Sequence, residues 1–223
     1  MENPWPGIEA AAALLENLPD DQESLKVFFA AYEDSRHSTN SYLASTLASL
    51  PTISPEFRPL LEKLLADDDF YTRLVGAKAI ARAGWVDEKG IGVLLEGLKH
   101  RDAYARTVAA SAFPFTGAQG KDSLPALLEA FVDEDEEVRG WAVAAVAKIG
   151  PDGQEAAEAF TGMLREKHAR IREWALAGLK RMGPGASLAM EAITACLNDP
   201  DEAVRKQAAA ALAAIQNAPA REN

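Results

Sequence analysis

Apolar and polar positions along this chain repeat with a period of 33 residues. One arginine marks each unit, and no insertion or deletion separates the five of them: Arg73, Arg106, Arg139, Arg172 and Arg205. In the unit that spans residues 133–150, small residues lie three and six positions after the arginine, and large apolar residues lie seven and ten positions after it. This spacing places them on one face of an α-helix. Such strict self-similarity predicts a solenoid of stacked helix pairs.

Each unit is expected to contain an outer helix, a turn and an inner helix that begins near the arginine. The outer helices are expected at residues 55–66, 88–99, 123–132, 154–166 and 187–198. A degenerate pair, 21–33 and 39–50, precedes them, with Asn40 at the arginine position. Residues 7–18 are expected to form a lone helix that covers the end of the stack. Pro114 lies inside the second inner helix and should end it early, because proline has no N–H to donate.

These elements predict one all-α domain over residues 1–223. Its expected parts are an N-terminal cap (1–20), a degenerate repeat (21–53), five clear repeats (54–217) and a frayed tail (218–223). Alanine and leucine are abundant and aromatic residues make up only 7% of the chain, which favours packed helices over a sheet-rich fold.

The turns before the inner helices carry a second pattern. Asp133 precedes Val138, Arg139 and Ala142, and the run 198–200 precedes a similar Ala-Val-Arg at 203–205. These pieces resemble the HEAT-repeat family, especially the short bacterial repeats also found in phycobilisome lyases. The resemblance implies an α-solenoid, an α-α superhelix of about six 33-residue HEAT-like repeats plus an N-terminal capping helix.

The resemblance also implies a structural ladder. In that family a turn aspartate and the arginine six residues later form a ladder between adjacent repeats. The second clear repeat has His100 at the turn and the fourth has Glu166, so we expect Arg106 to contribute less to stability than Arg139. The residues assigned to this ladder are Asp67, Arg73, Arg106, Asp133, Arg139, Arg172, Asp199 and Arg205.

Charge and cysteine content narrow the classes of function. The 223 residues carry a formal net charge of −11, which as a whole repels nucleic acid and anionic membranes. Cys196 is the one cysteine, and its place beside an apolar register position favours a buried, inert thiol. The sequence has no basic segment followed by an apolar run at its start and no run of about 20 apolar residues. We therefore expect a cytoplasmic protein.

Motifs for catalysis or ligand binding are weak. Residues 90–92 begin like a dinucleotide fingerprint, but Leu95 stands at the third glycine position. The acidic run 133–137 lacks the alternating ligands and the glycine of a calcium loop. The three histidines have no metal-ligand spacing: His37, His100 and His168. No serine, histidine and acid are joined by a recognisable motif. We predict no catalytic residue, no metal and no cofactor.

The positions not used for packing lie one, two, five and nine residues after each arginine and should face the concave side, where HEAT-like families often hold partners. Trp141 and Trp174 share one such position in adjacent repeats, so they should lie about 10 Å apart. An uncovered apolar stripe usually marks an interaction site; alternatively, both tryptophans pack between inner helices and set the curvature. The predicted partner-binding residues are Tyr42, Val75, Lys78, Arg82, Val108, Phe115, Trp141, Lys148, Trp174 and Arg181.

This predicted face is mildly basic on an acidic chain. In the five clear repeats it carries Glu173 as its one acid, against five basic residues: Lys78, Arg82, Lys148, Arg181 and Lys206. A basic face with an aromatic centre suits a protein or peptide partner that carries acidic and apolar groups.

We therefore predict a non-catalytic protein-binding scaffold, with no membrane partner. One alternative is a nucleic-acid-binding protein like the HEAT-type DNA glycosylases, suggested by two tryptophans and nearby basic residues. The net charge disfavours nucleic acid, and Ala145 and Gly178 stand where that family would place an acid one turn beyond the tryptophan. Another alternative is a bilin lyase-like subunit, suggested only by the type of repeat.

Overall fold

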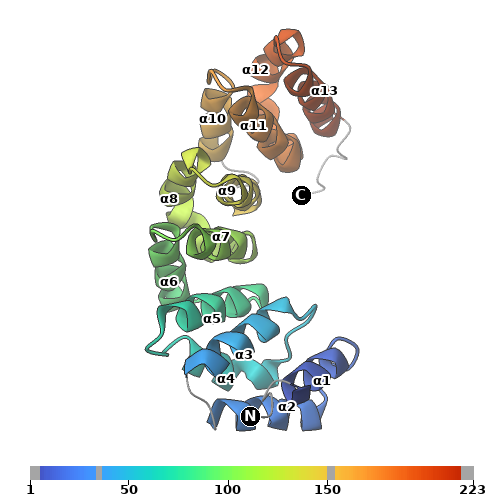
Figure 1. Cartoon of the computed structure of the whole chain (residues 1–223). Helices are drawn as coiled ribbons and strands as arrows, with labels where there is room; N and C mark the ends of the chain where they lie inside the picture. Colours follow the sequence, from blue (N-terminus) through green and yellow to red (C-terminus); the bar gives the residue numbers. More distant parts are fainter. Residues whose placement is uncertain (1–5, 34–36, 150–153, 217–223) are drawn as a thin grey trace. The chain divides into compact units, whose positions relative to one another are not determined.

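The computed structural model describes residues 6–33, 37–149 and 154–216, and all regular elements in these ranges are helices (Figure 1). The predicted all-α class is therefore confirmed. The chain forms two compact units, Met1–Gln119 and Gly120–Asn223, each a stack of helices. The prediction that they form one continuous domain stays a prediction. The predicted Gly-Pro turn at 150–153 and the tail at 218–223 lie outside the described residues.

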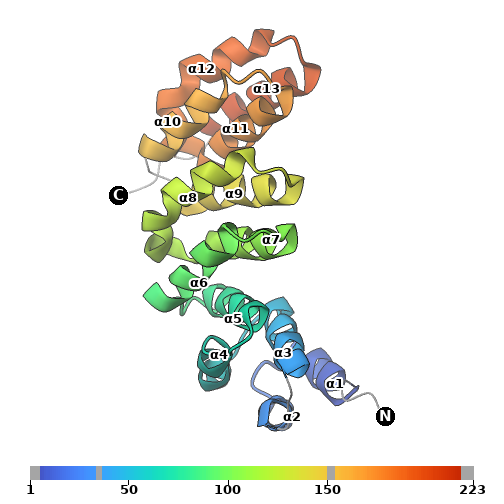
Figure 2. The same ribbon diagram turned by 60° about the vertical axis from the view of Figure 1, so that its left-hand side comes forward.

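The first unit begins with the lone helix α1 (Pro6–Leu15) and continues as three helix pairs. The pairs are α2 (Gln22–Glu33) with α3 (His37–Ser49), α4 (Arg58–Leu64) with α5 (Phe70–Arg82), and α6 (Glu88–Leu98) with α7 (Ala103–Ala112). The 3₁₀ turn η1 (Pro55–Phe57) leads into α4, and η2 (Phe113–Phe115) follows α7. The inner helices α3 and α5 pack side by side, as do α5 and α7 (Figure 2).

The second unit contains three pairs, and 3₁₀ turns flank two of the outer helices, α8 and α12. The pairs are α8 (Leu124–Glu129) with α9 (Glu136–Ile149), α10 (Gln154–Met163) with α11 (Ala169–Met182), and α12 (Met190–Ala195) with α13 (Glu202–Gln216). The 3₁₀ turns are η3 (Gly117–Ser123), η4 (Ala130–Val132), η5 (Gly183–Ala189) and η6 (Cys196–Asn198). The inner helix α11 packs between α9 and α13.

The inner helices keep the 33-residue period in their starting points. They begin at His37, Phe70, Ala103, Glu136, Ala169 and Glu202. In the last five, the ladder arginine is thus always the fourth residue. The predicted small positions are all buried, because a large partner from the outer helix fills the space beside them. The clearest case is Gly178, where an added Cβ would lie 2.4 Å from the ring of the fully buried Phe160.

Pro114 ends an inner helix as predicted. The helix α7 stops at Ala112, and residues 113–115 form a 3₁₀ turn. Phe113 belongs to the packing register and is fully buried, whereas Phe115 is half-buried. The prediction that Phe115 lies outside the core register is therefore confirmed.

The ladder arginines all use their side chains in one way. Each Nη1 donates to the backbone carbonyls of the residues six and five positions earlier, as Arg139 does to Asp133 at 2.6 Å and to Glu134 at 2.9 Å. Arg106 makes the same two bonds, to His100 and Arg101, both at 3.1 Å. The same geometry recurs at Arg73, Arg172 and Arg205. Because every residue type offers a backbone carbonyl, His100 serves Arg106 as Asp133 serves Arg139. The smaller contribution of Arg106 to stability stays a prediction.

The turn carboxylates have a different task from the expected one. Each accepts the backbone N–H two residues later through Oδ1, at 2.8–2.9 Å, and they are Asp67, Asp133 and Asp199. In the second repeat Nδ1 of His100 accepts the N–H of Asp102 in the same way, at 3.1 Å. The aspartate therefore shapes its own turn, and the hydrogen bonds of the arginine six residues later go to the backbone carbonyls of that turn.

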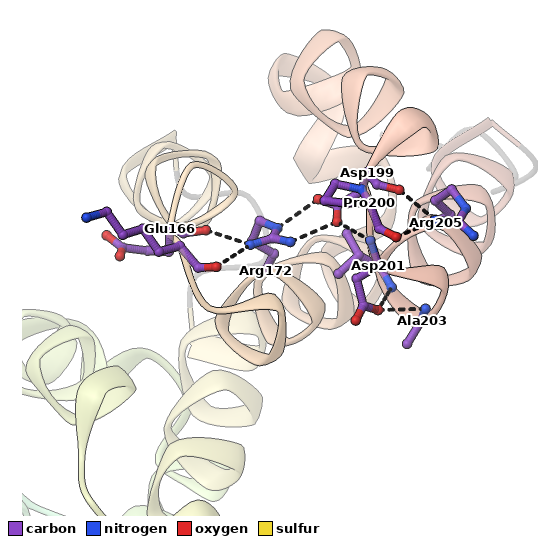
Figure 3. Close-up of polar contacts among 9 residues, drawn as sticks. Glu166, Arg172, Asp199, Pro200, Asp201, Ala203 and Arg205 are labelled. Carbon is purple, nitrogen blue, oxygen red and sulfur yellow. Dashed lines mark hydrogen bonds and ion pairs between the residues drawn. The ribbon is translucent and has the colours of Figure 1, made fainter.

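The contact between adjacent repeats instead spans 27 residues. Arg172 donates from Nε and Nη2 to the two carboxylate oxygens of Asp199, at 2.7 and 2.8 Å (Figure 3). Their side chains are only 10% and 8% exposed. In the first unit Asn40 donates to Asp67 at the same spacing, at 2.8 Å. A bidentate charged pair of this kind is far stronger than an exposed one.

The first prediction compares two ladder arginines. Arg172→Ala should lower the free energy of unfolding by about 3–5 kcal/mol, because it leaves the buried Asp199 carboxylate unpaired. Arg205→Ala removes the same two carbonyl bonds, but the ion pairs of the described residues do not include Arg205. It should cost only about 1–2 kcal/mol. Urea titration measures both values, and equal losses would contradict the proposed importance of the 27-residue contact.

The second prediction concerns pH. Hydrogen bonds from Arg172 hold the pKa of the Asp199 carboxyl below its ordinary value. A carboxyl whose pKa is lower in the folded state stabilises the fold above its unfolded pKa, and the contribution is lost as pH falls through the folded pKa. Asp199→Asn should therefore destabilise the protein clearly at pH 7 and progressively less below about pH 4. A pH-independent difference in unfolding free energy would be inconsistent with this pair.

Candidate functional site

The inner-helix face of the first unit contains a pocket of about 300 Å³. It is formed by α3, α5 and α7, and its lining residues are Ser45, Ala48, Ser49, Val75, Lys78, Arg82, Tyr104 and Val108. Four of the ten residues predicted for partner binding meet here, namely Val75, Lys78, Arg82 and Val108. The structure thus brings the first-unit part of the predicted face together at one place.

The helix α5 supplies three of the lining residues from one of its faces. Val75, Lys78 and Arg82 are spaced three and four residues apart, which aligns them along the helix. The helix begins where the carboxylate of Asp69 accepts the N–H of Thr72, at 2.7 Å. It ends before Gly84, whose φ of 77° is readily adopted only by glycine. These two signals place Arg82 in the last turn, a favourable position for a cation.

Two valines form the apolar floor of the pocket. Val75 is 5% exposed and Val108 is 6% exposed, so the position two residues after the arginine is almost covered in this unit. The preceding residue, Leu74, is fully buried and packs against Gly97 of α6, where an added Cβ would lie 2.6 Å from its Cδ1. The expectation that the position one residue after the arginine faces outward is wrong for Leu74, because this side chain fills the contact between α5 and α6.

Arg82 is held in place by two contacts. Its Nη2 donates to the backbone carbonyl of Leu50 at 3.0 Å. Its guanidinium carbon lies 5.2 Å from the ring centroid of Phe115, in a cation–π contact. Its Nε is buried without a hydrogen-bond partner among the described residues. Phe115, predicted as a binding residue, thus supports Arg82 from within the unit.

Lys78 adds a second cation to the pocket. Burial lowers the pKa of its ammonium group, and the neighbouring Arg82 lowers it further. No ion pair found in the described part of the chain joins either residue to a carboxylate. A partly desolvated charge without an opposite partner is unfavourable. The pocket therefore has a positive edge that the unit itself does not neutralise.

Tyr104 is the aromatic residue among the pocket's lining residues, and it was not among the predicted binding residues. It is 59% exposed, and its ring lies 6.4 Å from that of Tyr71. The hydroxyl of Tyr71 donates to the carboxylate of Asp102 at 2.7 Å, which fixes the neighbouring ring. The predicted binding positions follow the arginine of each repeat, whereas Tyr104 lies two residues before Arg106. The signal that could have found it is its spacing of four residues from Val108, which puts both on one helix face.

In the second unit the two tryptophans lie in different environments. Trp141 on α9 is 40% exposed. Trp174 on α11 is half-buried, and its ring centroid lies 4.5 Å from the guanidinium carbon of Arg139 and 5.7 Å from that of Arg170. The ring contacts among the described residues do not include a pair of these tryptophans. Trp174 therefore has a structural role in this unit, and its part in partner binding stays a prediction.

The remaining predicted binding residues lie on helices of both units. Lys148 on α9 and Arg181 on α11 are exposed. The hydroxyl of Tyr42 donates to Glu9 at 3.3 Å and so links α3 to α1. Their roles in binding also stay predictions.

Chemistry beyond binding has little support in the described ranges. Within residues 6–33, 37–149 and 154–216, no group of three histidine, cysteine or acidic side chains could hold a metal ion. Cys196 is buried, and burial raises the pKa of its thiol, which agrees with the predicted inert thiol. None of the described helices has the length and apolar character needed to span a bilayer. The cytoplasmic location stays a prediction.

Two protein-family models match this sequence. A model described as HEAT repeats matches residues 91–180, and one described as HEAT repeat matches residues 189–218, together more than half of the chain. The chain belongs to the HEAT-repeat family. The narrower likeness of these HEAT repeats to those of phycobilisome lyases stays a prediction. No protein with a curated description matches the sequence.

Several solved structures share the HEAT-like architecture. The archaeal HEAT-like repeats protein from Thermococcus onnurineus NA1 has 13% identity and a TM-score of 0.55, covering 94% of this chain and 92% of that one. An engineered protein has 20% identity and a TM-score of 0.55, covering 96% and 69%. A designed armadillo repeat protein in complex with the peptide (KR)4 has 18% identity and a TM-score of 0.51, covering 96% and 100%. At these identities the likeness shows the fold alone.

The third prediction separates the two tryptophans. Trp174→Ala should lower the unfolding free energy by about 2–4 kcal/mol, because it removes a half-buried ring and its contact with Arg139. Trp141→Ala should change stability by less than about 1 kcal/mol, since Trp141 is 40% exposed. Denaturant titration of both variants measures the difference. Similar large losses would show that Trp141 is also part of the packed interior.

Proposed function

We propose that this HEAT-repeat protein is a non-catalytic scaffold that binds a protein or peptide on its inner helices. The observation that carries the proposal is the pocket formed by α3, α5 and α7. It combines an apolar floor, an exposed aromatic ring and two cationic groups. Sites that recognise peptides and small groups commonly combine apolar surface with a few placed polar groups.

Tyr104 is the proposed anchor of the pocket. Tyrosine, tryptophan and arginine contribute most of the binding energy in many interfaces, especially beside well-packed apolar surface. Tyr104 stands beside the floor formed by Val75 and Val108 and is itself open to solvent. In the second unit we propose Trp141 as a further anchor, because it is the exposed tryptophan of the two.

The proposed partner carries acidic as well as apolar groups. Lys78 and Arg82 give the pocket a positive edge, which would attract a carboxylate and repel a basic peptide. The designed armadillo repeat protein of similar fold binds the basic peptide (KR)4. We propose that this chain instead prefers an acidic partner, because its pocket carries the cations Lys78 and Arg82.

The fourth prediction tests binding directly. A library of random peptides displayed on phage and selected on the purified protein should yield peptides with apolar and acidic residues. Their affinity, measured by fluorescence anisotropy, should fall at least about tenfold in Tyr104→Ala, which removes an exposed anchor with little effect on folding. Leu188→Ala is the matched control, because Leu188 is 70% exposed and lies in the second unit. It should bind like the parent.

Two outcomes would count against this function. Peptides that bind Tyr104→Ala as tightly as the parent would remove the pocket from the binding site. Tight binding of duplex DNA that weakens steeply with added salt would instead favour the nucleic-acid alternative.

A further inference from the structure

The cationic groups of the first-unit pocket are fixed before any partner arrives. Arg82 is oriented by the Leu50 carbonyl on one side and by the Phe115 ring on another. A guanidinium has five N–H donors, and among the described residues only the Nη2 bond to Leu50 uses one. Arg82 is therefore a preorganised donor with spare hydrogen-bonding capacity.

Lys78 lies one helical turn before Arg82 on the same face of α5, and both line the same pocket. Two half-buried cations one helical turn apart repel each other unless an anion lies between or beside them. In the described ranges neither has a carboxylate partner. The arrangement thus raises the free energy of the empty unit, which is typical of residues kept for binding and not for stability.

The surroundings favour a carboxylate over a phosphate. Phosphate sites typically use backbone N–H groups at helix N-termini, where the helix dipole is positive. Arg82 lies at the opposite end of α5, in its last turn, where the dipole is negative and disfavours a dianion. The floor of Val75 and Val108 offers apolar contact to the methylene stem of an acidic side chain.

We propose that this pocket binds the side-chain carboxylate of a glutamate in the partner, with Lys78 and Arg82 as its ligands and the two valines against its stem. The proposal rests on the proposed function and deepens it by naming the group that enters the pocket. A glutamate side chain has the single negative charge and the short apolar stem that these walls accept.

The test uses the full chain labelled with ¹³C at the ε carbons of its lysines. The NMR signal of Lys78 is assigned by its loss in Lys78→Arg, and exposed Lys89 on α6 serves as the internal control. The probe is N-acetylglutamate α-amide, which carries only a side-chain carboxylate. Three matched probes are N-acetylglutamine α-amide, N-acetylalanine and inorganic phosphate, which present a neutral isostere, a terminal carboxylate and a phosphate.

The expected result is a saturable shift of the Lys78 signal with the glutamate probe and a rise in the pKa of Lys78, since a nearby anion favours the ammonium form. The Lys89 signal should not respond. The glutamine probe should bind at least about fivefold more weakly, in line with the loss of one charge-assisted contact. Arg82→Met should weaken the response of Lys78 by a similar factor.

Several results would overturn the proposal. These are no saturable response, an equal response to the glutamine probe, or an equal shift at Lys89. Tighter binding of phosphate would assign the pocket to phosphate groups, and tighter binding of N-acetylalanine would assign it to chain termini. Lys78→Met removes the charge and leaves an unbranched side chain one atom shorter. It should not lower the melting temperature of the free protein, and the glutamate probe should no longer raise that temperature as it does in the parent.

The failure of this inference differs from the failure of the proposed function. Display-selected peptides that keep their affinity when each glutamate is replaced by glutamine would leave the scaffold function in place and remove the carboxylate site. A saturable response to the glutamate probe, with no peptide selected from the library, would support the carboxylate site and remove the support for the scaffold function.

Discussion

The structure depends on the pair of hydrogen bonds that each ladder arginine makes to the turn in front of its helix. The Nη1 group donates to two successive backbone carbonyls at once, and this double contact restricts the geometry of the arginine and its turn. These bonds fix the turn that joins an outer helix to its inner partner. The rotation about the helix axis is thereby set alike in the five inner helices that carry this arginine, and residues at equal distances from the arginine fall on equivalent faces. In the pocket lined by α3, α5 and α7, this common register places Val75 of α5 and Val108 of α7 at equivalent positions.

The contact that reaches the next repeat is far less uniform than the bonds to the turn. Asn40 reaches Asp67, and Arg172 reaches Asp199 with both carboxylate oxygens. Between α5 and the turn before α7, the ring of Phe70 stacks on that of His100, with centroids 4.8 Å apart. The inner helix is therefore joined to the turn of the next repeat by an amide hydrogen bond in one case, a salt bridge in another and a ring stack in a third. Side chains of different chemistry can substitute for one another there because the backbone geometry is already fixed by the arginine and its turn.

The sequence alone predicts where the inner helices lie and which of their residues are buried. The period located each inner helix, and Pro114 located the end of α7, because both depend on local backbone chemistry. The sequence predicts less well which side chains remain exposed for binding. Trp174 was placed on a binding face, but its ring packs on Arg139, and no sequence rule distinguishes an aromatic ring that awaits a partner from one that covers a neighbouring cation. Tyr104 was missed because its exposure depends on how α5 and α7 pack.

The bidentate contact between Arg172 and Asp199 also has a consequence for how the second unit opens. The free energy needed to open one helix pair of a repeat array depends on its contacts with the neighbouring pairs. Here the turn before α13 is tied by two charged hydrogen bonds to α11 in the preceding pair. The last pair must break a buried ion pair before it can detach. The pairs α10–α11 and α12–α13 should therefore exchange their backbone amide hydrogens as one cooperative block, with α13 as well protected as α11.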